Sequence, residues 1–349
     1  MGEPETVEPS GRLGIDAAAL EAWVAEHVPE RAGPLDVRQI RSGQSNPTYL
    51  VDSAAGRMVL RRKPPGDLLP SAHAIDREYR VMRALGEQGY PVPPMLALCE
   101  DRGVVGTEFY LMGHVEGRVF FDTGLPELSR EDRRAAYDAL IDRLADLHLI
   151  DWQAAGLGDF GRPSGYVARQ VRRWSEQYRK TETGTIPEMD RLIDWLPGAV
   201  ERLPDESCLV HGDYRLDNVM FAPDRPGIVA VLDWELSTLG HPLADLGYLL
   251  MTWTFPAGLR YGMAELDLEA LNIPTLGRAA ERYGARTGRS GLPDLDLLLA
   301  FNIFRIAAIL QGVYHRGLSG NAASDEALSM GADVARLARL ADARAARAG

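Results

Sequence analysis

One short segment limits what this chain can be more than any other feature of its sequence. Residues 208–219 read CLVHGDYRLDNV, which holds His211, Asp213 and Asn218 at fixed spacing between two apolar stretches. A further acidic residue, Asp233, follows the apolar run IVAVL, fifteen positions after Asn218. Short apolar runs of this kind predict strands. We therefore expect a loop between strands that brings two carboxylates and one amide oxygen to the same place.

The chemistry that this set of side chains suits is phosphoryl transfer. That reaction needs a carboxylate to accept the proton of an attacking hydroxyl, and Asp213 suits this role. It also needs divalent cations that prefer hard oxygen ligands, which Asn218 and Asp233 would supply to Mg²⁺. His211 is expected to orient the loop, because no second His or Cys stands at metal-ligand spacing. The alternative is that these acidic residues only form turns.

The rest of the chain predicts a sheet-rich first part and a helical second part. In the first part, strands are expected at 35–41, 48–52, 57–62, 95–100 and 107–112, and helices at 16–27, with Asp16 as N-cap, and 72–88. Beyond residue 118, helices are expected at 130–150, 166–180, 188–202, 241–254, 275–287, 294–316 and 324–346, with short strands at 219–222 and 228–232. We interpret this as a nucleotide-binding lobe over 1–113, a hinge at 114–118, and a helical lobe over 119–349 with the catalytic loop and acceptor site.

Composition excludes several classes of protein. A formal net charge of -12 argues against a nucleic-acid binder, which needs a basic face. Only two cysteines are present, Cys99 and Cys208, so a disulfide framework is not expected. There is no uninterrupted apolar stretch of about 20 residues, so we expect no membrane span. The acidic N-terminus is unlike a secretory signal and favours a cytoplasmic location. The sequence leaves monomer and homodimer open.

Three strings connect the chain to a known family. HGDYRLDN at 211–218, LDWELSTLGHPLADLGYL at 232–249 and FRIAAILQGVYHR at 304–316 are its most specific parts. With them the chain resembles the aminoglycoside phosphotransferase and choline kinase superfamily, relatives of the protein kinases, over about residues 37–340. It looks most like the kinase-like domains fused to, or encoded beside, acyl-CoA dehydrogenases. The resemblance implies a protein-kinase-like, two-lobed α+β fold that transfers phosphate from ATP or GTP, with Mg²⁺, to a small-molecule hydroxyl group.

The resemblance also implies where a nucleotide would bind. A loop between the first two strands would hold its phosphates through Gly43, Gln44, Ser45 and Asn46, although it contains one glycine where protein kinases have three. Arg61 stands where the family often has a lysine, and Glu78 is its expected helix partner; Lys63 is the weaker alternative. Replacement of lysine by arginine matters, because arginine is a planar fork and lysine a point charge. Adenine would meet the hinge at Met112, Gly113 and Val115.

The acceptor is expected beside the helix 299–316. Candidate contacts are Glu235, Arg305, Gln311 and Tyr314. A buried arginine needs a partner, which for Arg305 would be Glu235, Asp217 or an anionic substrate. Aromatic residues that either line this cleft or belong to the core are Trp174, Tyr178 and Trp253. The basic residues Arg169, Arg172, Arg173 and Arg179 argue against a polycationic aminoglycoside. The resemblance suggests a hydroxy acid or a hydroxyacyl-CoA-like acceptor instead, and Asp245 is expected to brace the helix that follows it or the catalytic loop.

One other function fits the same pattern, and two further functions are not expected. The single-glycine loop and Arg61 would fit a pseudokinase that binds a nucleotide or an acyl ligand without turnover. Protein-kinase activity is not expected, because no D-F-G or A-P-E string follows Asp233 and the stretch to His241 is short for a peptide-docking loop. An acyl-CoA dehydrogenase activity is not expected either, because the pattern differs from that of such flavoenzymes.

Overall fold

The computed structural model describes residues 5–10, 13–41, 46–66, 74–319 and 325–349. These residues form two compact units. The first comprises residues up to 119 together with 153–157 and 218–237, and the second comprises 120–152, 158–217 and 238–349. The third chain portion of the first unit, 218–237, carries both residues predicted to bind Mg²⁺, which the sequence had grouped with the helical part.

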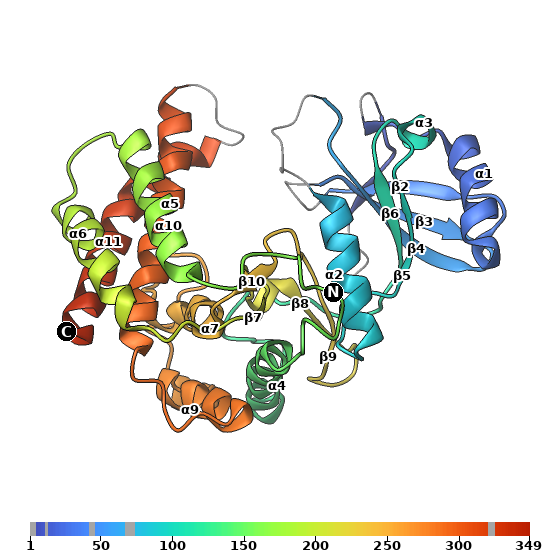
Figure 1. The fold of residues 1–349 in the computed structure, drawn as a ribbon. Helices are drawn as coiled ribbons and strands as arrows, with labels where there is room; N and C mark the ends of the chain where they lie inside the picture. The colour runs from blue at the N-terminus through green and yellow to red at the C-terminus, as the bar shows by residue number, and fades with distance from the viewer. Residues whose placement is uncertain (1–4, 11–12, 42–45, 67–73, 320–324) are drawn as a thin grey trace. The chain divides into compact units, whose positions relative to one another are not determined.

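The first unit is built on a six-stranded antiparallel sheet with the strand order β1-β2-β3-β4-β6-β5. Its strands are β1 (Thr6–Val7), β2 (Asp36–Ile40), β3 (Thr48–Ser53), β4 (Gly56–Arg62), β5 (Met95–Cys99) and β6 (Phe109–Gly113). Its helices are α1 (Ala17–His27), α2 (Ile75–Glu87) and the single turn α3 (Arg102–Val105) (Figure 1). All five predicted strands and both predicted helices are present. Asp16 caps α1 as expected, accepting hydrogen bonds from the amides of Ala18 and Ala19 at 3.1 Å.

The two faces of this sheet are covered by different helices. Met58 and Leu60 of β4 are buried in a core that includes Leu20 and Val24 of α1. Because side chains alternate along a strand, Arg61 points to the opposite face. There it meets α2, whose Glu78 it contacts. The alternation thus explains why Arg61 of β4 contacts the buried carboxylate of Glu78 on α2.

A small hairpin completes the first unit. Strands β8 (Val219–Phe221) and β9 (Ile228–Val231) pair antiparallel, with Val219 opposite Val231. It is attached to the segment after β6, since the amide and carbonyl of Phe221 both bond to Arg118. Gly117 allows this close approach, because a Cβ there would lie 2.6 Å from the Phe221 carbonyl oxygen. Asn218 and Asp233 therefore flank the same end of one hairpin.

The second unit is mainly helical. Its longer helices are α4 (Arg130–His148), α5 (Tyr166–Thr181), α6 (Pro187–Ala199), α7 (Pro242–Leu250), α9 (Leu276–Thr287), α10 (Leu295–Leu318) and α11 (Met330–Ala348), with the short α8 (Leu268–Leu271). Strands β7 (Cys208–Val210) and β10 (Thr238–Gly240) pair antiparallel. The sequence had missed β1, β10, α3 and α8. It was also wrong in starting the last helix at 324, because α11 begins at Met330 after a separate 3₁₀ turn.

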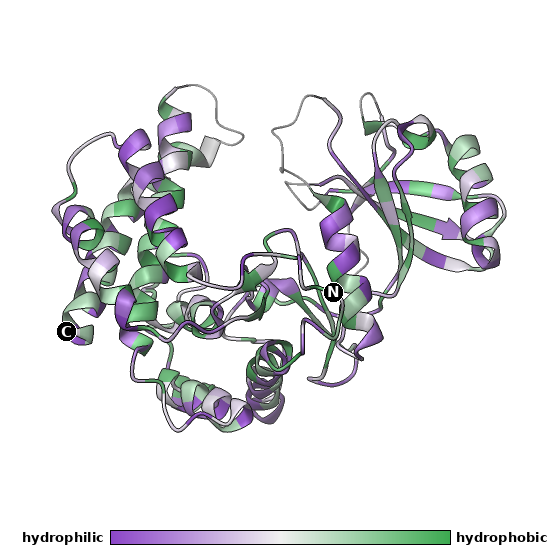
Figure 2. Cartoon of the chain, in the orientation of Figure 1, coloured by the Kyte–Doolittle hydropathy of each residue, from purple (hydrophilic) through white to green (hydrophobic). Residues whose placement is uncertain are grey.

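Helix α10 is the centre of the second unit, packed against α5, α7 and α11. Its buried residues occur on nearly all sides, and Figure 2 shows it largely hydrophobic, whereas α5 alternates between hydrophilic and hydrophobic turns. Among the described residues, α10 alone is long and apolar enough to cross a membrane by length and composition. However, 72% of its most apolar window is buried inside the folded chain. Core helices pass the same test, so this is weak evidence for a span.

Candidate active site

The loop after β7 presents the predicted base, Asp213. It is anchored by Asp245 of α7, whose carboxylate accepts the amides of His211 at 2.7 Å and Gly212 at 2.9 Å. Gly212 has φ +84°, a conformation that favours glycine. The amide of Asp213 then donates to Nδ1 of His211 at 3.2 Å. His211 is completely buried, and its hydrogen bond with the Asp213 amide lies within the loop itself.

Asp245 is itself held as an anion by its surroundings. Burial alone would raise its pKa, but the hydrogen bonds from His148 and from the amide of His211 bring the pKa of Asp245 below its usual value. His148 lies 3.3 Å from Asp245 and 2.7 Å from the hydroxyl of Tyr283. A buried chain of polar groups from α9 through α4 to α7 therefore supports the catalytic loop. The sequence had pointed to Asp245 but not to His148 or Tyr283.

The carboxylate of Asp213 has two described partners. Tyr248 of α7 donates its hydroxyl to Oδ1, and the guanidinium of Arg215 lies 3.4 Å from Oδ2. Burial is the main reason why the pKa of Tyr248 is raised, and the charge of Asp213 raises it further, so the phenol remains a donor at neutral pH. Arg215 also contacts Asp217 at 3.0 Å. Neither Tyr248 nor Arg215 had been singled out from the sequence.

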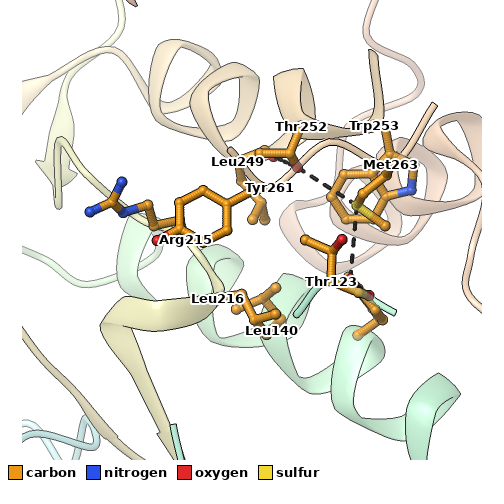
Figure 3. A pocket seen from close by; sticks show the side chains of 10 residues that line it. Thr123, Leu140, Arg215, Leu216, Leu249, Thr252, Trp253, Tyr261 and Met263 are labelled. Carbon is orange, nitrogen blue, oxygen red and sulfur yellow. Dashed lines mark hydrogen bonds between the residues drawn. The ribbon is translucent and has the colours of Figure 1, made fainter. Parts of the chain in front are cut away.

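Behind this loop lies a small cavity of about 10 Å³, roughly the room one water needs. Figure 3 shows the ring of Tyr261 beside Arg215, whose guanidinium points away from the other lining residues. The Tyr261 hydroxyl donates to Asp217 at 2.5 Å. Trp253, a candidate for the acceptor cleft, lines this cavity and is buried, with its Nε1 donating to the Pro274 carbonyl. Its described surroundings are those of a core residue.

The predicted metal ligands lie together in the first unit. The amide of Leu232 donates to the carbonyl of Asn218 at 2.8 Å, which places the backbone before Asp233 directly beside Asn218. Asp233 has φ +63°, a left-handed conformation unusual for a residue other than glycine. Residues held in such conformations cluster at functional sites. The backbone thus places Asn218 and Asp233 at one end of the β8–β9 hairpin.

Arg61 connects the sheet to these acidic groups. Its Nε lies 3.1 Å from Glu78, its Nη2 lies 3.3 Å from Asp233, and Glu235 is 3.9 Å away. The ion pair between Arg61 and Glu78 expected from the sequence is therefore present. Lys63, the weaker alternative, pairs with Glu108 instead. Arg61 stands in the lysine position with three carboxylates around it.

Glu78 is fully enclosed rather than a solvated helix charge. It is 1% exposed and accepts hydrogen bonds from Asn46 at 3.0 Å and Tyr110 at 2.9 Å. Burial raises the pKa of Glu78 to about 7, although Arg61 and Tyr110 act in the opposite direction. Asn46 thus uses its side-chain amide on Glu78. The other predicted phosphate-loop residues, Gly43, Gln44 and Ser45, lie outside the described residues.

The remaining predicted residues have ordinary structural partners or none. Gly113 donates its amide to the Pro94 carbonyl at 2.7 Å, and Met112 is half-buried in β6. In the described part of the chain, no acceptor lies within hydrogen-bond distance of the Val115 amide. Gln311 donates to the carbonyl of Thr181 at 2.6 Å, where α5 ends. Tyr314 packs against Gly331 of α11, where a Cβ would lie only 2.8 Å from its ring.

These features coincide with a clear relationship to known proteins. A model described as the phosphotransferase enzyme family matches residues 36–288. The chain belongs to this family. The resemblance inferred from the sequence and the kinase-like α+β fold are both confirmed.

Individual relatives of this phosphotransferase family member agree with the assignment. Mouse "Acyl-CoA dehydrogenase family member 10" is 43% identical over 344 residues, covering 98% of this chain but 32% of that protein. The chain thus spans about a third of the length of this curated relative. A Ralstonia eutropha crystal structure described as a "putative aminoglycoside phosphotransferase" is 46% identical, with a TM-score of 0.88, covering 95% of this chain and 99% of that chain.

A more distant relative shares the fold. A thermostable mutant of aminoglycoside phosphotransferase APH(4)-Ia, in a ternary complex with ADP and hygromycin B, has a TM-score of 0.60 at 17% identity, covering 95% of this chain and 99% of that chain. At this identity the likeness concerns the fold alone. Both similarities cover almost the whole phosphotransferase chain, so the two units described above together make up the family fold.

Proposed function

We propose that this family member is a small-molecule phosphotransferase that moves the γ-phosphate of ATP or GTP to a substrate hydroxyl group. Asp213 acts as the catalytic base, and Asn218 and Asp233 hold Mg²⁺. The observation that carries the proposal is the β8–β9 hairpin, which has Asn218 and Asp233 at the same end. The covalent chain keeps Asp213 within ~17 Å of Asn218, five positions away.

The residues present fit a magnesium ion by the chemistry of their donors. Carboxylate and amide oxygens are the hard ligands that Mg²⁺ takes in phosphate sites, where water and phosphates complete the shell. Among the described residues, no cluster of three or more His, Cys, Asp or Glu side chains could hold an ion by itself. When bound, Mg²⁺ supplies positive charge to the triphosphate. Arg61 lies next to Asp233 and is expected to bind the α- and β-phosphates.

The remaining residues position and exchange protons. Asp213 accepts the proton of the attacking hydroxyl, while Tyr248 and Arg215 hold its two oxygens in place. His211 and Asp245 keep the loop backbone fixed. Met112, Gly113 and Val115 are proposed to contact the adenine, and the Val115 amide is the donor left for it. General-base catalysis of this kind contributes on the order of 10²- to 10⁴-fold.

The acceptor is proposed to be a hydroxy acid or a hydroxyacyl-CoA-like compound rather than an aminoglycoside. Helix α5 exposes Arg172 and Arg173, and no acidic run accompanies them. Such a face repels a polycation and attracts an anion. Glu235, Gln311 and Tyr314 remain candidate acceptor contacts.

A screen of ATP consumption tests this function. Hydroxy acids, hydroxyacyl-CoAs, amino alcohols and aminoglycosides are offered with ATP and Mg²⁺, and Asp213→Asn serves as the blank. We expect turnover with an anionic acceptor that falls at least 100-fold in Asp213→Asn and stops on removal of Mg²⁺ by a chelator. Full turnover by Asp213→Asn would show that the base is assigned wrongly.

A second candidate is a pseudokinase that binds its nucleotide without turnover. The observation in its favour is the contact between Arg61 and Asp233, because a cation already neutralises one of the proposed metal ligands. Thermal-shift titration separates the two functions. The enzyme is stabilised by ATP only with Mg²⁺ and slowly consumes it, whereas the pseudokinase is stabilised without any loss of ATP.

A further inference from the structure

Arg305 of α10 is a buried cation without a buried anion. It is 8% exposed, and within the described residues it forms no ion pair with any carboxylate. The sequence had offered Asp217 and Glu235 as partners. Asp217 instead contacts Arg215, Arg260 and Tyr261, and Glu235 lies 3.9 Å from Arg61. A buried charge is costly unless it is paired and hydrogen-bonded.

The contacts that Arg305 does make leave part of its guanidinium unused. Nη2 donates to the Gly212 carbonyl at 3.0 Å, while the buried Nε has no hydrogen-bond partner. The guanidinium lies over the rings of Tyr248, at 5.1 Å, and Trp174, at 5.9 Å. Ring contacts of this kind are weaker than an ion pair in a desolvated setting. The Nε–H group of Arg305 therefore has no acceptor among the residues that the structure describes, and the positive charge of its guanidinium is not balanced by a carboxylate there.

A second arginine faces the same tryptophan. Arg173 of α5 lies over the Trp174 ring at 5.1 Å and, like Arg305, pairs with no carboxylate in the described part of the chain. Both arginines, with Arg169, lower the pKa of the buried Tyr166 against the dominant effect of burial. Helices α5 and α10 thus each place an arginine guanidinium over the ring of Trp174. Positive potential from arginines on both helices favours an anion near this ring.

This cationic corner is connected to the proposed base. Tyr248 contacts Arg305 through its ring and Asp213 through its hydroxyl. Arg305 also holds the carbonyl of Gly212, which immediately precedes Asp213. A molecule whose anionic group binds Arg305 would therefore bring a nearby hydroxyl group toward Asp213.

We propose that Arg305 and Arg173, on either helix beside Trp174, form a binding site for an anionic group, a carboxylate or a phosphate, carried by the acceptor. That the anionic group belongs to the phosphate acceptor rests on the proposed function, but binding of the anion itself does not require turnover. Arg305 supplies a buried, oriented fork, and Arg173 supplies exposed charge. The site excludes acceptors that carry only positive charge.

The test measures binding at Arg305 directly, by NMR on protein labelled with ¹⁵N-arginine. The probes are butyrate, methyl phosphate and the neutral butyramide, and the Arg305 Nε–H signal is assigned by its loss in Arg305→Lys. We expect a saturable millimolar shift of this signal with butyrate, methyl phosphate or both, and none with butyramide. The responding anion identifies the group as carboxylate or phosphate. No saturable shift with either anion, or an equal one with butyramide, would overturn the site.

Two exposed variants guard against a folding failure of Arg305→Lys. Arg173→Gln should weaken anion binding by about threefold to tenfold, whereas Lys180→Gln, at the exposed end of the same helix, should leave it within twofold. An equal effect of both would mean that only diffuse charge attracts the anion, which also contradicts the proposal. Because these titrations contain no nucleotide, they can succeed even if Asp213→Asn shows that the phosphotransferase assignment is wrong, and they can fail while it holds.

Discussion

The hydroxyl of Tyr248 donates a hydrogen bond to Oδ1 of Asp213 across 35 positions of sequence. Tyr248 stands on the first long helix after the catalytic loop, and the same helix provides Asp245, which binds the loop backbone. Helix α7 therefore fixes both the main chain and the side chain around the proposed base. A carboxylate positioned in this way loses less freedom when it accepts a proton from a bound hydroxyl group.

Tyr248→Phe should therefore lower kcat by about fivefold, the effect of one hydrogen bond of about 1 kcal/mol, with KM for ATP unchanged. Initial rates on the acceptor identified by the ATP-consumption screen measure this. The matched control is Tyr214→Phe, which removes a buried hydroxyl that donates to the Leu140 carbonyl at 2.9 Å. Loss of stability without a selective fall in kcat in Tyr248→Phe would mean that the tyrosine only fills space.

The second prediction concerns Arg61 as a structural cation. Above about pH 7, where Glu78 is ionised, Arg61→Met leaves its carboxylate buried without a counter-ion, and removing one partner of a buried pair costs about 3–5 kcal/mol. We expect the midpoint of urea unfolding to fall accordingly. Arg83→Met, on the solvent side of α2 and paired with the exposed Glu87, should change the free energy of unfolding by less than about 1 kcal/mol. Similar losses in the two variants would contradict a special role for Arg61.

The third prediction is a pH dependence that comes from Glu78. Its pKa is raised to about 7 in the folded state, so between about pH 4.5 and pH 7 the folded chain binds the proton that the unfolded chain has lost. Stability must then fall as the pH rises through this range, by on the order of 1–3 kcal/mol. Glu78→Gln keeps hydrogen bonds to Tyr110 and Asn46 possible and should remove this slope.

Urea unfolding at pH 5, 6 and 7 measures the effect of Glu78. Glu87→Gln, an exposed glutamate at the end of the same helix, serves as the control and should keep the slope of the wild type. A slope that is as steep in Glu78→Gln as in the wild type would assign the pH dependence to another group.

Structural elements that extend over many residues could be predicted from the sequence pattern, whereas several shorter ones could not. Long amphipathic helices and the β8–β9 hairpin were predictable because periodicity and apolar runs span many residues, and the spacing of Asp213, Asn218 and Asp233 is local. Strand β10 was missed because only one of its three residues, Leu239, has a large apolar side chain. The break before α11 was missed because Glu326, Ala327 and Leu328 of the 3₁₀ turn before it are themselves good helix formers.

The supporting residues of the site could not be read from the sequence for a different reason. His148 meets Asp245 from 97 positions away, and Tyr248 reaches Asp213 only because α7 packs beside the loop. Such contacts are set by tertiary packing, and no local spacing marks them. The same limit applies to Arg305, whose burial was foreseen but whose lack of a carboxylate partner was not.

The last prediction concerns Asp245, which holds the catalytic loop in place. Asp245→Asn replaces a carboxylate that accepts two backbone amides by a group with one acceptor oxygen and one donating nitrogen. At least one buried amide then loses its partner, so we expect a loss of about 2–3 kcal/mol in the free energy of unfolding.

Because the pKa of Asp245 is lowered in the folded state, its contribution to stability is present above its unfolded pKa and is lost as the pH falls through the folded value. The stability of the wild type should thus fall more steeply below pH 4 than that of Asp245→Asn, whereas Asp333→Asn, in a surface pair with Arg336, should behave like the wild type. Urea unfolding from pH 3 to pH 6 checks both effects, and equal acid sensitivity in Asp245→Asn and the wild type would show that Asp245 is not the anion on which the loop depends.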